Sequence, residues 1–322
     1  MYMKRQKSTS VILYILVSVM LICLTACSGD KASDSRTTTE EAISEAETLT
    51  RDIHKLSDVK SISDNKYSCS YDGVSHEFIL FLPNETTDAP LVLMLHGYGE
   101  SAERFRYYSH FEQSAVPEGY AVCYITGAAN PNDSTSSNGW NSGIAADGND
   151  DLSFLISLSD YLREEYGLNK DKLFAIGFSN GAFMIHRLAV EAGDVFTGLI
   201  SVAGKMPESI WAEREAGFCT SFFQVTGEKD DVVPMNSSGT SKYAKDPAIE
   251  DVIDYWVQKA GLSKTDESEV GNRSVLTKYG ADSEKISIWN LWIKDARHSW
   301  PDESVNKINI NEYIIEFLNG LR

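Results

Sequence analysis

The chain has 322 residues, of which 42% are hydrophobic, and it carries 47 acidic against 29 basic residues, a formal net charge of −18. This apolar content is sufficient for a full hydrophobic core, and the length suits one large domain with a terminal extension. Because nucleic-acid binding depends on Lys and Arg contacts with phosphates, so strong an acidic excess argues against a nucleic-acid partner, while it leaves the fold open.

The N-terminus has the pattern of a bacterial secretory signal. Three basic residues precede an apolar run from Val11 to Leu24, which is shorter than the roughly 20 residues that a membrane-spanning helix needs. The run ends in Leu24-Thr25-Ala26-Cys27, which resembles a lipobox, where a peptidase cuts before a cysteine that then carries a diacylglycerol. We expect residues 1–26 to be a lipoprotein signal peptide and Cys27 to anchor the protein at the extracellular face of the cell membrane. The alternative is a plain cleavable signal and a secreted protein.

A polar segment follows the expected signal. Residues 28–60 are rich in Ser, Thr, Glu, Asp and Ala and contain no aromatic residue. Such a segment buries too little apolar surface to offset its ordering entropy, so residues 27–60 are predicted to be a flexible acidic tether. One folded domain is then expected over 61–322. Removing the signal removes three basic residues, and the charge becomes 26 − 47 = −21.

Strand and helix patterns alternate through this domain. Two short runs around Asp72-Gly73 predict a hairpin, and Leu91 to Leu95 is an aliphatic run typical of a strand buried on both faces. A long loop rich in Gly, Asn, Ser and Asp is expected over 130–150, with Trp140 in its middle. The alternation predicts an α/β fold, a mostly parallel central sheet with helices on both faces and a site at the carboxyl edge of the strands. The expected strands are 66–71, 76–82, 91–95, 120–125, 172–176, 198–202, 221–226 and 285–293, and the expected helices are 101–115, 151–166, 181–192, 249–259 and 311–321.

Three cysteines lie outside the targeting segment, an odd number that cannot pair completely. Cys69, Cys123 and Cys219 allow one disulfide with one thiol, or three thiols, and the sequence does not choose between these. No CxxC or His cluster has zinc spacing. Neither a metal nor a cofactor is therefore expected.

Gly177-Phe178-Ser179-Asn180-Gly181 is a G-x-S-x-G pattern between an apolar strand and an amphipathic helix. An abrupt strand-to-helix turn strains the serine backbone, and the flanking glycines allow close approach of the chain. The hydroxyl then projects at a helix N-terminus, where partial positive charge favours a developing anion. We interpret Ser179 as a nucleophile; the alternative is a glycine-rich turn with a structural serine.

A nucleophilic serine needs a base and an acid that orients the base. His298 follows an expected strand and lies after Ser179 in the chain, whereas His186 lies within the helix that starts at the serine and cannot fold back. Asp230 and Asp231 both qualify as the acid, and Glu228 is a weaker candidate. The alternative for these acids is a solvated surface turn. His54 falls in the tether, and His76 and His110 are interpreted as surface or packing residues.

An oxyanion hole is expected from two backbone N–H groups. The first is that of Asn180, the residue after the nucleophile, and the second comes from His96-Gly97-Tyr98-Gly99 after the 91–95 strand. We favour the Tyr98 N–H. His96 is interpreted as a structural histidine that braces this loop, rather than as a second base.

These motifs, in this order, resemble secreted esterases that include polyhydroxybutyrate depolymerase-like proteins and the feruloyl or acetyl-xylan esterases of carbohydrate esterase family 1. The resemblance covers Tyr71 to Leu321 and implies an α/β-hydrolase fold. The family's G-x-x-D-x-V-V-P and H-x-W-P patterns imply Asp230 as the acid and His298 as the base. The segments that carry the resemblance are 95–102, 150–155, 177–184, 227–234 and 298–301, and the departures from it are Met235, Asp302 and Arg297.

The resemblance implies a serine esterase acting on feruloyl or acetyl esters of plant cell-wall polysaccharide. Trp140 and Trp300 are candidates to stack on a phenolic acyl group or a sugar ring, with packing roles as the alternative. A polyester depolymerase is the nearest rival. A non-catalytic glycan-binding surface lipoprotein is the rival of another class. The sequence leaves the oligomeric state open.

Overall fold

The computed structural model describes residues 56–129, 135–144, 148–217, 219–236, 242–281 and 286–322. The expected signal peptide, Cys27, His54 and most of the expected tether lie outside these residues. None of the described helices is long and apolar enough to span a bilayer.

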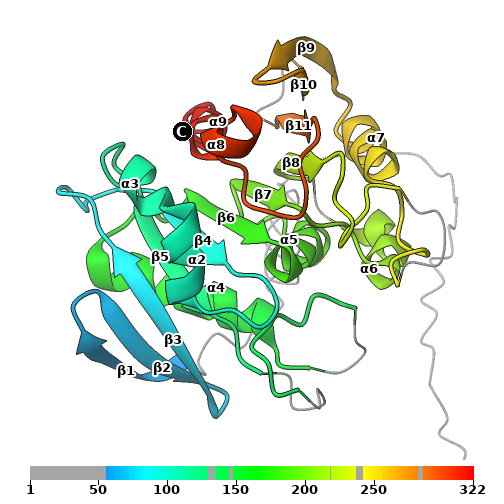
Figure 1. The fold of residues 1–322 in the computed structure, drawn as a ribbon. Coiled ribbons are helices and arrows are strands. Elements are labelled where there is room, and N and C mark those ends of the chain that lie inside the picture. The colour runs from blue at the N-terminus through cyan, green and yellow to red at the C-terminus, as the bar shows by residue number, and fades with distance from the viewer. Residues whose placement is uncertain (1–55, 130–134, 145–147, 218, 237–241, 282–285) are drawn as a thin grey trace, which may run out of the picture. The chain divides into compact units, whose positions relative to one another are not determined.

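One mixed sheet of 11 strands runs through the described part of the chain, in the order β1-β2-β3-β5-β4-β6-β7-β8-β11-β10-β9 (Figure 1). The strands are β1 (Leu56–Ser63), β2 (Lys66–Tyr71), β3 (Val74–Phe81), β4 (Leu91–Leu95), β5 (Ala121–Thr126), β6 (Leu173–Phe178), β7 (Gly198–Val202), β8 (Ser221–Gly227), β9 (Ser263–Val270), β10 (Ser274–Gly280) and β11 (Ile288–Ile293). The helices are α2 (Ala102–Ser109), α3 (Phe111–Ala115), α4 (Asp151–Tyr166), α5 (Asn180–Glu191), α6 (Glu208–Ala212), the 3₁₀ turn η2 (Arg214–Ala216), α7 (Ile249–Lys259), α8 (Glu303–Asn306) and α9 (Ile310–Asn319).

The centre of the sheet is parallel. Strands β5, β4, β6, β7, β8 and β11 pair in parallel with one another, and their side chains are almost all buried. Antiparallel strands continue the sheet at both sides, β3, β2 and β1 beyond β5, and β10 and β9 beyond β11. The predicted mostly parallel α/β architecture is confirmed.

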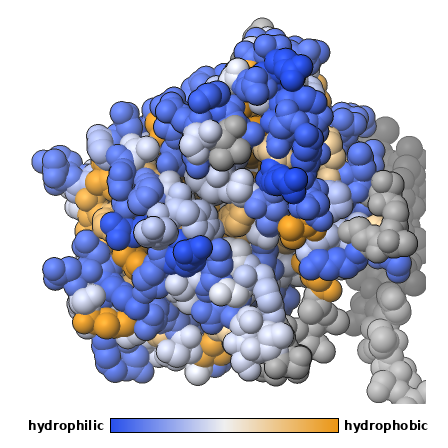
Figure 2. Space-filling model, in the orientation of Figure 1, coloured by the Kyte–Doolittle hydropathy of each residue, from blue (hydrophilic) through white to orange (hydrophobic). Residues whose placement is uncertain are grey.

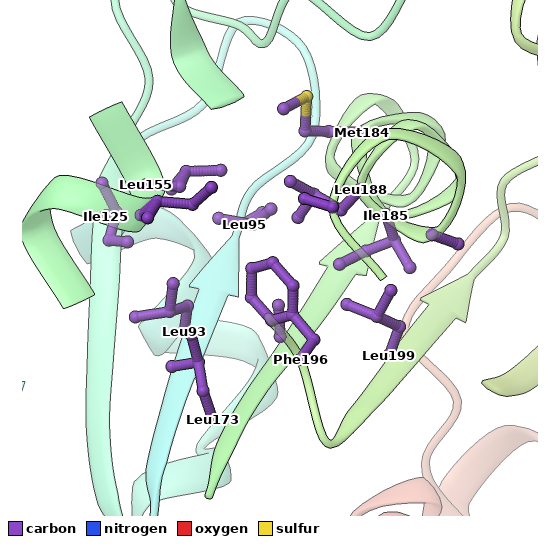
Figure 3. Close-up of a cluster of buried hydrophobic side chains, with 14 of the residues drawn as sticks. Leu93, Leu95, Ile125, Leu155, Leu173, Met184, Ile185, Leu188, Phe196 and Leu199 are labelled. Atoms are coloured by element: carbon purple, nitrogen blue, oxygen red, sulfur yellow. The ribbon is translucent and has the colours of Figure 1, made fainter. Parts of the chain in front are cut away.

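Helices cover both faces of the sheet. Alternate residues of β4 separate two cores: Leu91, Leu93 and Leu95 pack with α4, α5 and α7, whereas Val92 and Met94 pack with α2, α3 and α9. Figure 3 shows the first core, where side chains of β4 and β7 meet those of α4 and α5. This double burial explains why the parallel strands are continuous aliphatic runs rather than alternating ones.

The predicted boundaries of β4, β7, α4 and α7 match the structure residue for residue. The helix expected over 101–115 instead breaks into α2 and α3 at His110, which has a φ of 46°. Left-handed backbone ends a helix. Strands β9 and β10 were not predicted; β9 is polar and exposed, with no apolar face that a pattern could reveal.

The folded part starts earlier than expected. Strand β1 begins at Leu56, five residues before the predicted boundary at residue 61, and it pairs antiparallel with β2. Its polar composition suggested a tether, but Leu56 and Val59 pack against the core. The cysteines of the described residues form no disulfide with one another, and burial raises the pKa of the Cys69 thiol to about 12.

Candidate active site

Ser179 occupies the sharp turn between β6 and α5. Its backbone has φ 51° and ψ −115°, a left-handed conformation that costs a non-glycine residue about 1–3 kcal/mol. The glycines on either side explain how the turn forms. A Cβ on Gly177 would lie 2.2 Å from the Gly181 carbonyl oxygen, and a Cβ on Gly181 would lie 2.1 Å from the Leu95 carbonyl oxygen. Only glycines fit at these two positions.

His298 and Asp230 line up behind Ser179. His298 Nε2 lies 2.8 Å from Ser179 Oγ, and His298 Nδ1 lies 2.8 Å from Asp230 Oδ2. The other carboxylate oxygen of Asp230 accepts the N–H groups of Val232 and Val233, at 3.0 and 2.8 Å. If Nδ1 carries the proton that it donates to Asp230, Nε2 is left to accept the serine proton. The arrangement is therefore suited to activating a serine for nucleophilic attack.

The other two acidic candidates face elsewhere. Asp231 is exposed and lies 3.7 Å from Arg297, whereas Glu228 pairs with Lys294 and accepts the Asp295 N–H. Among the three acids, the structure brings Asp230 alone to His298.

Parallel pairing of neighbouring strands brings these residues together. Asp230 follows β8 and His298 follows β11, and the two strands pair in parallel from Phe222 to Gly227 and from Ile288 to Ile293. The loops after the two strands are tightly packed, because a Cβ on Gly227 would lie 2.7 Å from the Ala296 carbonyl oxygen. The Phe178 ring lies 5.2 Å from the His298 imidazole and fills the space beside it.

The loop that follows β4 lies next to Ser179. A Cβ on Gly97 would lie 3.5 Å from the Ser179 Cβ, so the loop backbone approaches the serine closely. The Gly97 N–H donates to Glu100 Oε2, and the Gly99 N–H donates to the Asn138 carbonyl. Tyr98 lies between these two anchored glycines. Asn180, the other expected oxyanion donor, is the first residue of α5.

His96 is fully buried at the start of this loop. Its Nε2 accepts the Gly127 N–H at 2.9 Å, so the proton resides on Nδ1, which lies 2.6 Å from the Gly97 carbonyl oxygen. Burial lowers the pKa of His96 to about 4. These contacts match the expected bracing role. His76 is stacked on Phe154, and His186 is buried beside Ser201.

Trp140 and Trp300 do not present their rings for stacking, contrary to the interpretation from sequence. They are 5% and 8% exposed. The Trp140 indole N–H donates to the His96 carbonyl, and the Trp300 ring packs edge-on against Phe105. Each ring is part of the scaffold, because its apolar body is buried and its N–H has a partner.

Sequence reasoning missed a set of polar side chains behind the site. The Asn180 side-chain amide accepts the Trp140 N–H and donates to the Trp140 carbonyl. Asp151 accepts the Asn141 N–H. Burial raises the pKa of Asp151 to about 7, against weaker opposing effects of the Asn141 N–H and Arg187. The Asp150-Asp151 pair at a helix start was visible in the sequence, but nothing there showed which carboxyl points inward. No group of three or more His, Cys, Asp or Glu side chains in the described ranges could hold a metal ion.

Comparison with known proteins gives the family. A family model described as Serine hydrolase (FSH1) matches residues 86–256, which is 171 of 322 residues and includes Ser179 and Asp230. The chain belongs to the FSH1 serine hydrolase family. His298 lies beyond the matched part of the chain.

Two curated relatives are similar to part of this chain. The esterase candidate NocK of Nocardia uniformis subsp. tsuyamanensis is 33% identical over 165 residues, which is 50% of this chain and 45% of NocK. The bifunctional acetylxylan esterase/xylanase XynS20E of Neocallimastix patriciarum is 23% identical over 175 residues, 54% of this chain and 24% of XynS20E. The chain thus spans less than half the length of either relative.

A solved structure shows the fold. The acetyl xylan esterase from Aspergillus awamori matches with a TM-score of 0.54 and 15% identity, over 82% of this chain and 99% of that one. The chain has the α/β-hydrolase fold. The narrower placement among depolymerase-like proteins and carbohydrate esterase family 1 stays a prediction.

Proposed function

We propose that this protein hydrolyses carboxylic esters through an acyl-enzyme on Ser179. The observation that carries the proposal is the continuous line from Asp230 through His298 to Ser179, with both hydrogen-bond distances at 2.8 Å and the serine on a left-handed turn. Family membership supports a serine hydrolase, and the names of NocK and XynS20E support an ester substrate.

In the proposed reaction, His298 takes the Ser179 proton as Oγ attacks the ester carbonyl, and Asp230 stabilises the resulting imidazolium. The backbone N–H groups of Tyr98 and Asn180 are the proposed donors to the oxyanion, each worth on the order of 3 kcal/mol to the transition state. His298 then protonates the leaving alcohol. Water, activated by the same imidazole, releases the acid and restores Ser179.

The proposed substrates are feruloyl or acetyl esters of plant cell-wall polysaccharide. Exposed apolar residues on the loops around Ser179 support an acyl or aryl group there: Tyr98 and Ile144 are each 53% exposed, and Val232 is 49% exposed. Each lies within two residues of a site residue: Tyr98 follows Gly97, Ile144 follows Ser142 and Val232 follows Asp230. On the face drawn in Figure 2, hydrophobic residues lie scattered among hydrophilic ones. That surface suits a hydrated polymer better than a lipid layer.

We propose in addition that Cys27 is lipidated and anchors the enzyme at the extracellular face of the membrane, where a polymeric substrate is accessible. The support is the lipobox-like Leu24-Thr25-Ala26-Cys27. Expression of the full chain in a bacterial host tests this proposal. Detergent-phase partitioning that persists in Cys27→Ser would contradict it.

The function is tested by assaying residues 28–322 on methyl ferulate and on a simple acetyl ester, with Ser179→Ala as the control. Ferulate turnover that the mutation abolishes establishes a cinnamoyl esterase, and turnover of the acetyl ester alone moves the substrate to acetylated xylan or a polyester. A protein inert towards both esters would leave a different acyl group or the glycan-binding alternative, and the proposed mechanism would lose its main support.

A further inference from the structure

Trp140 lies between the two segments that carry the proposed oxyanion donors. Its indole N–H donates to the His96 carbonyl at 2.9 Å, and this carbonyl also accepts the Gly181 N–H at 3.1 Å. Its ring centroid lies 5.3 Å from that of His96. A single carbonyl thus links Trp140, the loop after β4 and the first turn of α5.

The backbone of Trp140 is held by the Asn180 side chain. The Trp140 N–H donates to Asn180 Oδ1 at 2.7 Å, and Asn180 Nδ2 lies 3.3 Å from the Trp140 carbonyl oxygen. Asn180 therefore contacts Trp140 through its side chain while its own N–H is a proposed oxyanion donor. The position of this donor and the position of Trp140 depend on each other.

The backbone of the next residue, Asn141, is held by side chains from two helices. The Asn141 N–H donates to Asp151 Oδ2 of α4 at 2.6 Å, and Arg187 Nη1 of α5 donates to the Asn141 carbonyl at 2.6 Å. Asp151 is 1% exposed, so the anchor is rigid. Close packing leaves the segment no room to shift, because a Cβ on Gly127 would lie 2.3 Å from the Gly139 carbonyl oxygen.

We propose that Trp140 is a positioning residue that keeps the Tyr98 and Asn180 backbone donors in register with Ser179, an inference that rests on the proposed acyl transfer. Oxyanion donors act within a few tenths of an ångström, and a misplacement of about 1 Å can cost about 100-fold in rate. Two loops from separate strands reach this precision only if something fixes one to the other. The direct bond from the Gly181 N–H to the His96 carbonyl is one such link, and Trp140 adds a second through its indole N–H on one side and its peptide groups on the other.

The test is Trp140→Phe, which keeps an aromatic ring and removes the N–H that bonds the His96 carbonyl. The matched control is Trp289→Phe on β11, where the indole is 8% exposed and donates to Ser287 Oγ at 2.9 Å, away from the site. Each variant loses one indole hydrogen bond. Two rates are compared: kcat and KM for an acetyl ester, and phosphorylation of Ser179 by diisopropyl fluorophosphate, followed by mass spectrometry.

We expect Trp140→Phe to lower kcat and the phosphorylation rate by about tenfold or more, with KM within about threefold, because oxyanion contacts act in the transition state. Trp289→Phe should stay within about twofold of the wild type in both rates. Equal rates in the two variants would overturn the inference and leave the proposed function standing. A wild-type protein that neither turns over esters nor reacts at Ser179 would sink the proposed function and the inference with it.

A second pair of variants covers the case in which Trp140→Phe does not fold. Arg187→Ala removes the bond to the Asn141 carbonyl from a partly exposed side chain, whereas Glu191→Ala removes only the ion-pair partner of Arg187. We expect several-fold lower kcat and phosphorylation rate in Arg187→Ala than in Glu191→Ala. Matching rates for this pair would count against the positioning role.

Discussion

Asp230 and Asp231 are neighbours in the chain, but Asp230 is buried and Asp231 is exposed. Asp230 is 5% exposed, with one carboxylate oxygen on His298 and the other on two backbone N–H groups. Asp231 lies in solvent beside Arg297. A carboxylate fixed on both oxygens can hold an imidazole in one tautomer and orientation, which a solvated one cannot.

Asp230→Asn is expected to lower kcat by on the order of 10³–10⁴-fold, because an amide at this position favours the wrong imidazole tautomer. Asp231→Asn should change kcat by less than about twofold, since exposed ion pairs contribute little. Steady-state kinetics on an acetyl ester compare the two. Similar losses in both variants would show that the acid has been misassigned.

Asp151 is a buried carboxyl that costs stability at neutral pH. Its pKa is raised from 3.8 to about 7, chiefly by burial, and its Oδ1 is buried with no hydrogen-bond partner among the described residues. Between these two pKa values the folded protein keeps a proton that the unfolded chain has lost. This stabilising contribution is present below pH 3.8 and is lost as the pH rises through about 7. A residue kept at such a cost is consistent with a role in the site.

Asp151→Asn should therefore become stabilising as the pH rises. The amide keeps an acceptor for the Asn141 N–H and never ionises. At pH 8 the free energy of unfolding of the variant should exceed that of the wild type by an amount that is at most about 4 kcal/mol, whereas near pH 4 the two should differ little. Urea denaturation at the two pH values measures this. A difference that does not change with pH would mean that Asp151 titrates normally.

At the scale of elements, the turn from β6 into α5 depends on backbone contact rather than on side-chain packing. Gly181 lies in the first turn of α5, directly against the carbonyl of Leu95 at the end of β4. Glycine in a helix is normally about 1 kcal/mol worse than alanine. Here the neighbouring strand reverses that preference, because any Cβ would overlap backbone that is itself fixed in the sheet.

Gly181→Ala is thus expected to destabilise the protein by several kcal/mol or to displace Ser179 and abolish activity, despite the gain in helix propensity. Gly280→Ala is the matched control, since its Cβ would meet only Thr265 Cγ2 at 3.6 Å. Thermal unfolding and esterase activity of the two variants are compared. A fully active, stable Gly181→Ala protein would contradict the close approach of β4 and α5.

At the scale of the whole molecule, the sheet extends well beyond the strands that carry the site. The antiparallel hairpins at both sides put polar, exposed strands at the edges, with β1 at one end and β9 at the other. Polar edge strands limit edge-to-edge association of the sheet. Strand β1 covers β2, whose Cys69 and Tyr71 are buried.

A chain that begins at Thr50 should unfold at the same temperature as one that begins at Ser28. A chain that begins at Asp64 lacks β1, exposes the edge of β2 and should unfold several degrees lower or aggregate. Differential scanning calorimetry and light scattering of the three chains give the answer. An unchanged melting temperature without β1 would mean that this strand does not stabilise the domain, and the predicted boundary at residue 61 would stand.

The sequence alone determined the α/β architecture and the strand-to-helix turn at Ser179. It also limited the candidate acids to a few residues after one strand. These follow from local signals: buried parallel strands are apolar throughout, and a strand-to-helix turn with glycines two before and two after a serine has a specific geometry. It also limited the base to His298, since the order of elements left no other histidine in reach.

The family pattern already implied Asp230, but only the tertiary structure shows how the carboxylates and the tryptophans are held in place. Asp230 and Asp231, or Asp150 and Asp151, differ by one position in the chain, and their environments are set by loops that follow other strands. The same holds for Trp140: the sequence left stacking on a substrate and packing in the fold open, whereas in the structure its indole N–H and its peptide groups bond residues 44 and 40 positions away. Periodicity and propensity describe neighbours along the chain, whereas these contacts join neighbours in space.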